Sequence, residues 1–115
     1  MHEAGLMQTA LDLACDRARQ AGGVAVRRLV LRVGADAGVE PDALRFAFEA
    51  LAPGTPAGAA VLDIEVVPAR TRCPGCDRGF EPDGPLLACP ACGVIAGGLS
   101  SGQELELVRI EVSVP

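Results

Sequence analysis

Two pairs of cysteines constrain this chain more than any other feature. They are Cys73 with Cys76 and Cys89 with Cys92, in the pattern CxxC-x12-CxxC. Two residues between thiolates allow both sulfurs of a tight turn to face one metal ion at about 2.3 Å. The segment 70–100 has no long helical or strand period. About 30 residues rarely fold without a disulfide bond or a bound metal ion. The pattern therefore predicts a structural zinc site that folds a small inserted domain at residues 70–100.

Two other uses of four cysteines stay open, a rubredoxin-like iron centre and a redox-active dithiol. Iron is less favoured, because Phe80 is the only aromatic residue of the insert. Four protein thiolates fill a tetrahedral site, so the predicted zinc has no open position for catalysis. Cys15 stands apart from the two pairs. Its place on an apolar helical stripe predicts a small core residue.

The segments on either side of the insert have the periodicities of helices and strands. Apolar residues at three- and four-residue spacing indicate helices, and strict alternation indicates strands. Two glycines end the first helix, and a proline suits the first position of the second. The patterns predict helices over 3–20 and from Pro41 onward, and strands over 26–33, 62–66 and 105–114.

The order of these elements predicts an α+β fold, a three-stranded sheet packed with two helices. The last strand returns after the insert, so the main domain is predicted to be discontinuous, residues 1–69 together with 101–115. The alternation of that strand slips by one residue near 107–108. A slip of this kind indicates either a β-bulge or a strand buried on both faces.

The charge balance excludes several classes of partner. The chain has 115 residues and a net charge of −5, and all ten basic residues are arginines scattered along it. Nucleic acids and anionic membranes bind through clustered positive charge, which is missing here. The first residues lack the basic and apolar regions of a targeting signal. The longest uncharged run, 84–103, is broken by two prolines and five glycines. The sequence therefore predicts a soluble cytoplasmic protein.

The N-terminus carries the only histidine of the chain, His2. The amine of Met1, the backbone nitrogen of His2 and its imidazole can reach one ion through small chelate rings. Nitrogen donors in a plane suit Ni(II) or Cu(II). A solvated histidine without a ligand role is the alternative. No catalytic constellation and no phosphate-binding G-x-x-x-x-G-K-[ST] loop is present, which predicts that the chain is not an enzyme.

Taken together, several motifs resemble the HypA/HybF family of hydrogenase, and in some organisms urease, nickel-incorporation metallochaperones. The resemblance covers essentially the whole chain. It rests on Met1-His2-Glu3, Val39-Glu40-Pro41 followed by Leu44-Arg45-Phe46-Ala47-Phe48-Glu49, the CxxC-x12-CxxC insert and the terminal Arg109-Ile110-Glu111. One departure is that the insert has no histidine beside its cysteines.

The resemblance implies a metal and a set of ligands. Ni(II) would be the transferable ion, held by His2, the Met1 amine and the backbone nitrogen of Glu3. Zn(II) would be structural, held by the four cysteines of the insert.

The resemblance also implies partners, a nickel-binding hydrogenase-maturation GTPase and the precursor of a [NiFe]-hydrogenase large subunit, with urease accessory proteins in some organisms. The chain would be a monomer or a homodimer, in which the last strand could exchange between copies. The alternative function is a zinc-ribbon interaction or regulatory module without a transferable metal.

Overall fold

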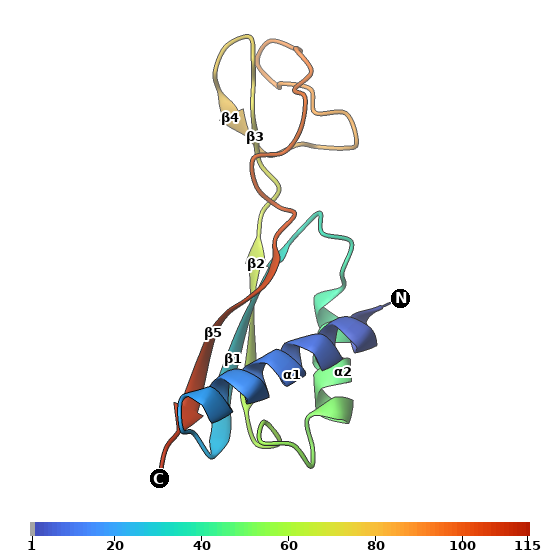
Figure 1. The fold of residues 1–115 in the computed structure, drawn as a ribbon. Coiled ribbons are helices and arrows are strands. Elements are labelled where there is room, and N and C mark those ends of the chain that lie inside the picture. The colour runs from blue at the N-terminus through green and yellow to red at the C-terminus, as the bar shows by residue number, and fades with distance from the viewer. Residues whose placement is uncertain (1) are drawn as a thin grey trace. The chain divides into compact units, whose positions relative to one another are not determined.

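The structure is a computed structural model and describes residues 2–115 (Figure 1). A three-stranded sheet of order β2-β1-β5 is accompanied by two helices, and β3 and β4 form a separate two-stranded sheet. The expected α+β class is confirmed. The elements in chain order are α1 (Glu3–Gln20), β1 (Ala25–Gly34), α2 (Pro41–Leu51), β2 (Val61–Val67), β3 (Thr71–Arg72), β4 (Gly79–Phe80) and β5 (Leu105–Ser113).

Backbone signals in the sequence set the helix ends. Helix α1 is followed by Gly22, whose φ of 74° lies in the left-handed region that glycine adopts without steric cost. The N–H of Gly23 then donates to the carbonyl of Ala18 at 2.8 Å and closes the helix. Helix α2 begins with Pro41, whose missing N–H would have no partner inside the helix at that position.

The core of the main α+β layer lies between the helices and one face of the sheet (Figure 1). Leu29 and Leu31 of β1 point to this layer and are almost fully buried, and Val30 between them is buried as well. The buried positions of each helix recur at helical spacing and therefore form one apolar stripe per helix. These stripes consist of Met7, Leu11, Ala14 and Ala18 on α1, and Leu44 and Ala47 on α2.

The opposite face of the sheet carries a row of ion pairs around Arg28 and Arg32 of β1. Arg28 pairs with Asp63 of β2 and with Glu111 of β5, the second at 3.6 Å. Arg32 contacts Glu65 of β2 at 3.3 Å and Glu106 of β5 at 3.5 Å. Central arginines therefore neutralise carboxylates on both neighbouring strands.

These ion pairs also show how the side chains of β5 alternate between the two faces of the sheet. Glu106 and Glu111 are an odd number of positions apart, yet both reach arginines on the same face of β1. A regular strand would place them on opposite faces. The alternation of β5 therefore slips between them, as the sequence indicated, and the slip favours the bulge over burial on both faces.

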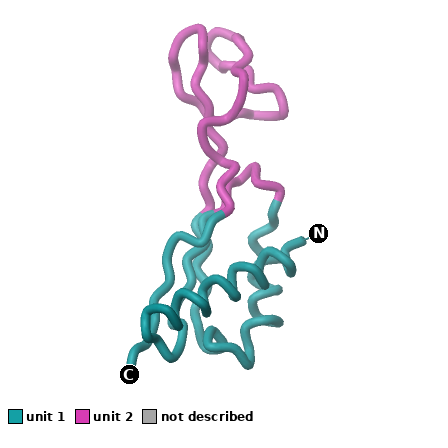
Figure 2. Tube along the Cα trace, viewed as in Figure 1, with its two compact units in different colours: residues 1–32, 39–65, 106–115 teal, residues 33–38, 66–105 magenta. Residues whose placement is uncertain are grey.

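The chain divides into two compact units (Figure 2). The first consists of residues 1–32, 39–65 and 106–115, and the second of residues 33–38 and 66–105. The segment 70–100 lies within the second unit, and its independence as a domain stays a prediction. Among residues 2–115, no helix has the length and apolar character needed to span a bilayer.

Removing a buried side chain from β1 tests the position of this core. Leu29 is 0% exposed, whereas Leu13 of α1 is 40% exposed. Leu29→Ala is expected to lower the free energy of unfolding by about 2–5 kcal/mol, through lost burial and the cavity it leaves. Leu13→Ala is the matched control and should cost less than about 1 kcal/mol. Chemical denaturation of the two variants measures the difference, and equal losses would contradict this description of the core.

Candidate metal centres

The first cysteine pair lies in the turn that joins β3 to β4. These strands pair antiparallel, with Thr71 opposite Phe80, so Cys73 begins the turn. The N–H of Cys73 donates to the carbonyl of Arg78 at 2.8 Å, and the N–H of Asp77 donates back to the carbonyl of Cys73 at 2.9 Å. Asp77 has a φ of 63°. This left-handed residue turns the backbone so that the two cysteines lie on one side of the loop.

The second pair repeats the construction of the first. The N–H of Cys89 donates to the carbonyl of Val94, and the N–H of Gly93 donates to the carbonyl of Cys89, both at 2.9 Å. Gly93 has a φ of 79° and occupies the place that Asp77 has in the first turn. An isolated bridge between Ala88 and Ile95 closes the loop. Each CxxC is therefore held by the same two backbone hydrogen bonds and one left-handed residue.

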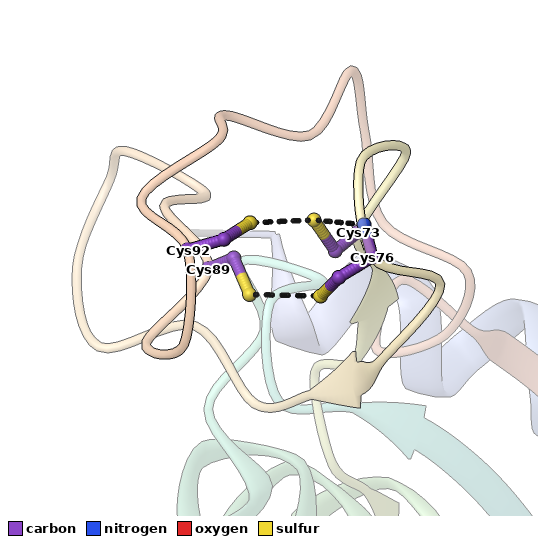
Figure 3. A group of neighbouring side chains, drawn as sticks. All are labelled: Cys73, Cys76, Cys89 and Cys92. Carbon is purple, nitrogen blue, oxygen red and sulfur yellow. Dashed lines mark hydrogen bonds between the residues drawn. The ribbon is translucent and has the colours of Figure 1, made fainter.

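The two turns face each other and bring the four sulfurs together (Figure 3). All four lie within 4.8 Å of one another. The Sγ atoms of Cys73 and Cys92 are 3.4 Å apart, and those of Cys76 and Cys89 are 3.7 Å apart. A tetrahedron with zinc–sulfur bonds of about 2.3 Å has edges of about 3.8 Å. The sulfur arrangement therefore fits a tetrahedral zinc ion.

The electrostatics of the cluster favour deprotonated sulfur on its buried side. Backbone N–H groups of Cys92 and Ala91 point at the sulfur of Cys89 and lower the pKa of that thiol to about 6. The N–H groups of Cys76 and Gly75 lie 3.4 and 3.3 Å from the sulfur of Cys73, and its pKa is lowered too. Thiolates are the form that binds zinc, so the turns prepare two ligands.

Cys92 behaves in the opposite way. The N–H of Val94 acts to lower its pKa, but the neighbouring thiols, of which Cys73 contributes most, together with burial raise that pKa to about 11. Four thiolates within 4.8 Å repel one another unless a cation lies between them. A divalent ion held by the four cysteines would supply the missing charge, and its binding would release the protons that remain.

The apolar support of the cluster is small. Cys73, Cys89 and Phe80 form one buried group, with the aromatic ring placed by the register of β3 and β4. Cys76 and Cys92 are exposed. One aromatic ring and two thiols cannot hold a fold of this length without a further bond, which is the situation in which zinc supplies folding free energy.

Gly93 provides a direct test of the second turn. Gly93→Ala places a Cβ at a φ of 79°, a conformation that costs an L-residue roughly 1–2 kcal/mol. Zinc affinity should therefore fall by about five- to thirtyfold. Gly97→Ala is the matched control, because its added Cβ would meet no atom within 4 Å and its φ lies outside the left-handed region. Chelator competition measures both, and unchanged affinity in Gly93→Ala would contradict the proposed role of this turn.

The predicted nickel site falls at the start of α1. Met1 lies outside the described residues, so the place of its amine stays a prediction. His2 is exposed and is the N-cap of α1, with no hydrogen bond from its side chain to the helix. Its carbonyl accepts the N–H of Leu6 at 2.9 Å. The helix thus fixes the backbone of His2 while its imidazole stays accessible to a metal ion.

The structure gives a role to the side chain of Glu3, in addition to the backbone nitrogen that the resemblance implies as a nickel ligand. Glu3 is only 8% exposed, although it lies in the first turn of α1. Its carboxylate accepts the N–H of Glu40, the N-cap of α2, at 3.3 Å. The side chain of Glu3 therefore ties the start of α1 to the start of α2. No local sequence signal reports this contact, because the two residues are far apart along the chain.

The remaining cysteine and acidic residues form no second centre. In the part of the chain that the structure describes, the four paired cysteines are the one group of three or more histidine, cysteine, aspartate or glutamate ligands close enough to share an ion. Cys15 lies apart and is partly exposed, so the expectation of a core position holds only in part. The sulfur cluster was found from spacing alone, whereas the left-handed Asp77 gave no recognisable signal.

The fold and the cluster define a class, that of small α+β proteins with a four-cysteine metal-binding ribbon inserted between two strands. The family model described as hydrogenase/urease nickel incorporation, metallochaperone, HypA matches residues 1–112. The hydrogenase maturation factor HypA of Picosynechococcus sp. is 41% identical over 97% of this chain and 99% of that protein. That of Chloroflexus aggregans is 42% identical over 96% of this chain and 98% of that protein.

Solved structures give the same result for the fold. The solution structure of the Ni metallochaperone HypA from Helicobacter pylori matches with a TM-score of 0.69 at 21% identity, over the full length of both chains. A second solution structure of a HypA protein has a TM-score of 0.71 at 21% identity. The chain belongs to the HypA family of hydrogenase/urease nickel-incorporation metallochaperones. The resemblance seen in the sequence is confirmed.

Proposed function

We propose that this chain binds Ni(II) at its N-terminus and delivers it during maturation of a [NiFe]-hydrogenase. The observation that carries the proposal is the position of His2, the single histidine of the chain, exposed at the residue that begins α1. Family membership over residues 1–112 supports nickel as the cargo. The ligands would be the Met1 amine, the backbone nitrogen and imidazole of His2, and the backbone nitrogen of Glu3.

The zinc site has a separate, structural role in this proposal. Cys73, Cys76, Cys89 and Cys92 would hold one Zn(II), whose binding stabilises the two turns and leaves no open coordination position. Zinc and nickel would be distinguished by donor type. Soft thiolates select zinc in the ribbon, whereas nitrogen donors in a plane suit Ni(II) at the N-terminus.

Delivery needs partners that supply energy and accept the ion. The sequence has no phosphate-binding loop of the G-x-x-x-x-G-K-[ST] kind, so we assign nucleotide hydrolysis to a nickel-binding maturation GTPase. The acceptor would be the precursor of the hydrogenase large subunit, and urease accessory proteins where urease is also served. The chain would have no catalytic residues of its own. We assign it to the cytoplasm, because its five cysteines form no disulfide in the described residues and a reducing compartment keeps thiols available to zinc.

Complementation tests this function in cells. A hydrogenase-producing host that lacks its own HypA protein should regain hydrogenase activity with the wild-type chain. His2→Ala should restore less than about a hundredth of that activity at low nickel, because loss of a ligand outweighs the ten- to hundredfold effect of a supporting residue. Gln8→Ala is the matched control on the exposed side of α1 and should restore activity fully. Full activity with His2→Ala would contradict the proposal.

A further inference from the structure

Strand β5 is an edge of the three-stranded sheet, and an edge strand offers unpaired N–H and C=O groups to another strand. Beside it, a groove of about 250 Å³ runs between α1 and β5. Leu13 on the helix side is 40% exposed, and Ile110 on the strand side is half-buried. The groove is lined by Leu13, Arg17, Leu107, Val108, Arg109 and Ile110.

The charged residues of β5 lie on the face that points away from the helices. Glu111 reaches Arg28 of β1 on that face, and Arg109 contacts the same carboxylate at 3.2 Å. Both Arg109 and Glu111 are substantially exposed, at 63% and 45% of their side-chain surface. Ile110 between them points to the opposite face, toward the groove, because neighbouring residues of a strand alternate.

This pattern is self-complementary in one register. When two copies of β5 pair antiparallel with Ile110 opposite Ile110, Arg109 of each copy stands opposite Glu111 of the other. Opposite charges in directly paired positions stabilise a sheet, and like charges destabilise it. Moving the register by one residue on each strand places Arg109 opposite Arg109, or Glu111 opposite Glu111. The charges therefore select a single alignment that keeps both sets of helices on the same side.

The charges on β2, the other edge strand of the sheet, do not favour pairing with a second copy. Strand β2 carries Asp63 and Glu65 on the same outer face, where they pair with the arginines of β1. Two copies of β2 aligned antiparallel about Ile64 would place Asp63 opposite Glu65 twice. The adjacent registers would oppose Asp63 to Asp63 or Glu65 to Glu65. The charges of β2 thus oppose self-pairing in every one of these registers, whereas those of β5 favour it in one register.

We infer that a second copy of this chain docks on β5, with the two strands pairing antiparallel about Ile110 into one continuous six-stranded sheet. Backbone hydrogen bonds join the strands, and Val108 of each copy lies opposite Val112 of the other. Around the two-fold axis, the apolar side chains of the two β5 strands continue the grooves between α1 and β5. The two pairs of Arg109 with Glu111 fix the register. This interface keeps β5 beside β1 of its own chain, so it differs from an exchange of the last strand between copies.

Charge reversal at β5 tests the interface in the full-length, zinc-loaded protein without nickel, which makes the result independent of the nickel proposal. Arg109→Glu creates two repulsive pairs in place of two attractive ones. The dissociation constant of the homodimer, measured by sedimentation velocity, should rise by about ten- to a hundredfold. Arg45→Glu on α2 makes the same charge change at an exposed residue away from β5 and should leave the dimer unchanged.

Mixing two variants gives the decisive result. Arg109→Glu and Glu111→Arg should each be mainly monomeric, yet their mixture should form a heterodimer in which both charge pairs are restored. Since Glu111 also contacts Arg28, thermal unfolding and zinc content show whether the second variant is folded.

Salt provides a test that needs only the first variant, because screening weakens attraction and repulsion alike. Added salt should loosen the wild-type dimer and tighten that of Arg109→Glu. A wild-type chain that stays monomeric at high concentration would overturn the proposal. A dimer insensitive to both variants would do so as well, and would indicate strand exchange instead.

Discussion

Replacing Cys73 with alanine is expected to abolish zinc binding and unfold the turns of the second unit, while the first unit stays folded. The reason is the distribution of apolar burial. The ribbon has one buried aromatic ring beside two cysteines, whereas the helices and β1 share a core of fully buried Leu and Met side chains. Zinc binding is therefore folding free energy for the ribbon and contributes little to the main layer.

Zinc analysis and amide NMR spectra measure the two parts of this prediction separately. Resonances of residues 71–96 should lose dispersion in Cys73→Ala, and those of α1 and β1 should keep it. Cys92→Ala should behave alike, since its sulfur lies 3.4 Å from that of Cys73. Cys15→Ala is the matched control, because this cysteine lies outside the cluster and should retain full zinc. Full zinc occupancy in Cys73→Ala would disprove the ligand assignment.

Two changes at the N-terminus are expected to remove tight nickel binding while leaving the fold and zinc unchanged. His2→Ala removes the only imidazole, and one residue added before Met1 converts the amine into an amide. Each should weaken nickel binding by at least about a hundredfold, since each removes a direct ligand. His2 is exposed and its side chain makes no capping hydrogen bond, so stability should change by less than about 0.5 kcal/mol.

Calorimetric nickel titration of the untagged wild type and the two variants distinguishes the ligands. Loss of binding in His2→Ala but not in the extended chain would keep His2 as a ligand and exclude the amine. Equal binding in all three proteins would show that His2 is a solvated residue. Zinc content and thermal unfolding serve as controls in each case, because a global change would mimic the loss of a ligand.

Most of the secondary structure could be predicted from the sequence, because each helix and long strand has its own apolar periodicity. The helix over 3–20 was expected with the bounds that α1 has, since its apolar period and the glycines after it agree. The sulfur cluster was equally predictable, because CxxC spacing defines a turn wherever it lies. The slip near 107–108 was visible as a change of phase. The ion pairs of Glu106 and Glu111 were needed to choose the bulge.

The features that could not be predicted depend on contacts between distant residues or on one unusual backbone angle. Glu3 is buried and accepts a hydrogen bond from Glu40, far along the chain, and sequence periodicity carries no information about such a contact. Asp77 takes the left-handed conformation that glycine takes in the second turn. Aspartate tolerates this conformation better than most residues. An aspartate after a CxxC pair is nevertheless not enough to predict a left-handed backbone at that position.

Metal stoichiometry of the untagged, full-length protein tests the central claim most directly. The protein is analysed for zinc and nickel as purified, and again after incubation with Ni(II) and removal of unbound metal. One zinc per chain in both samples, with about one nickel per chain only in the second, is the result expected for a four-thiolate zinc site and a separate nickel site. Zinc without bound nickel, or nickel that displaces the zinc, would contradict the account.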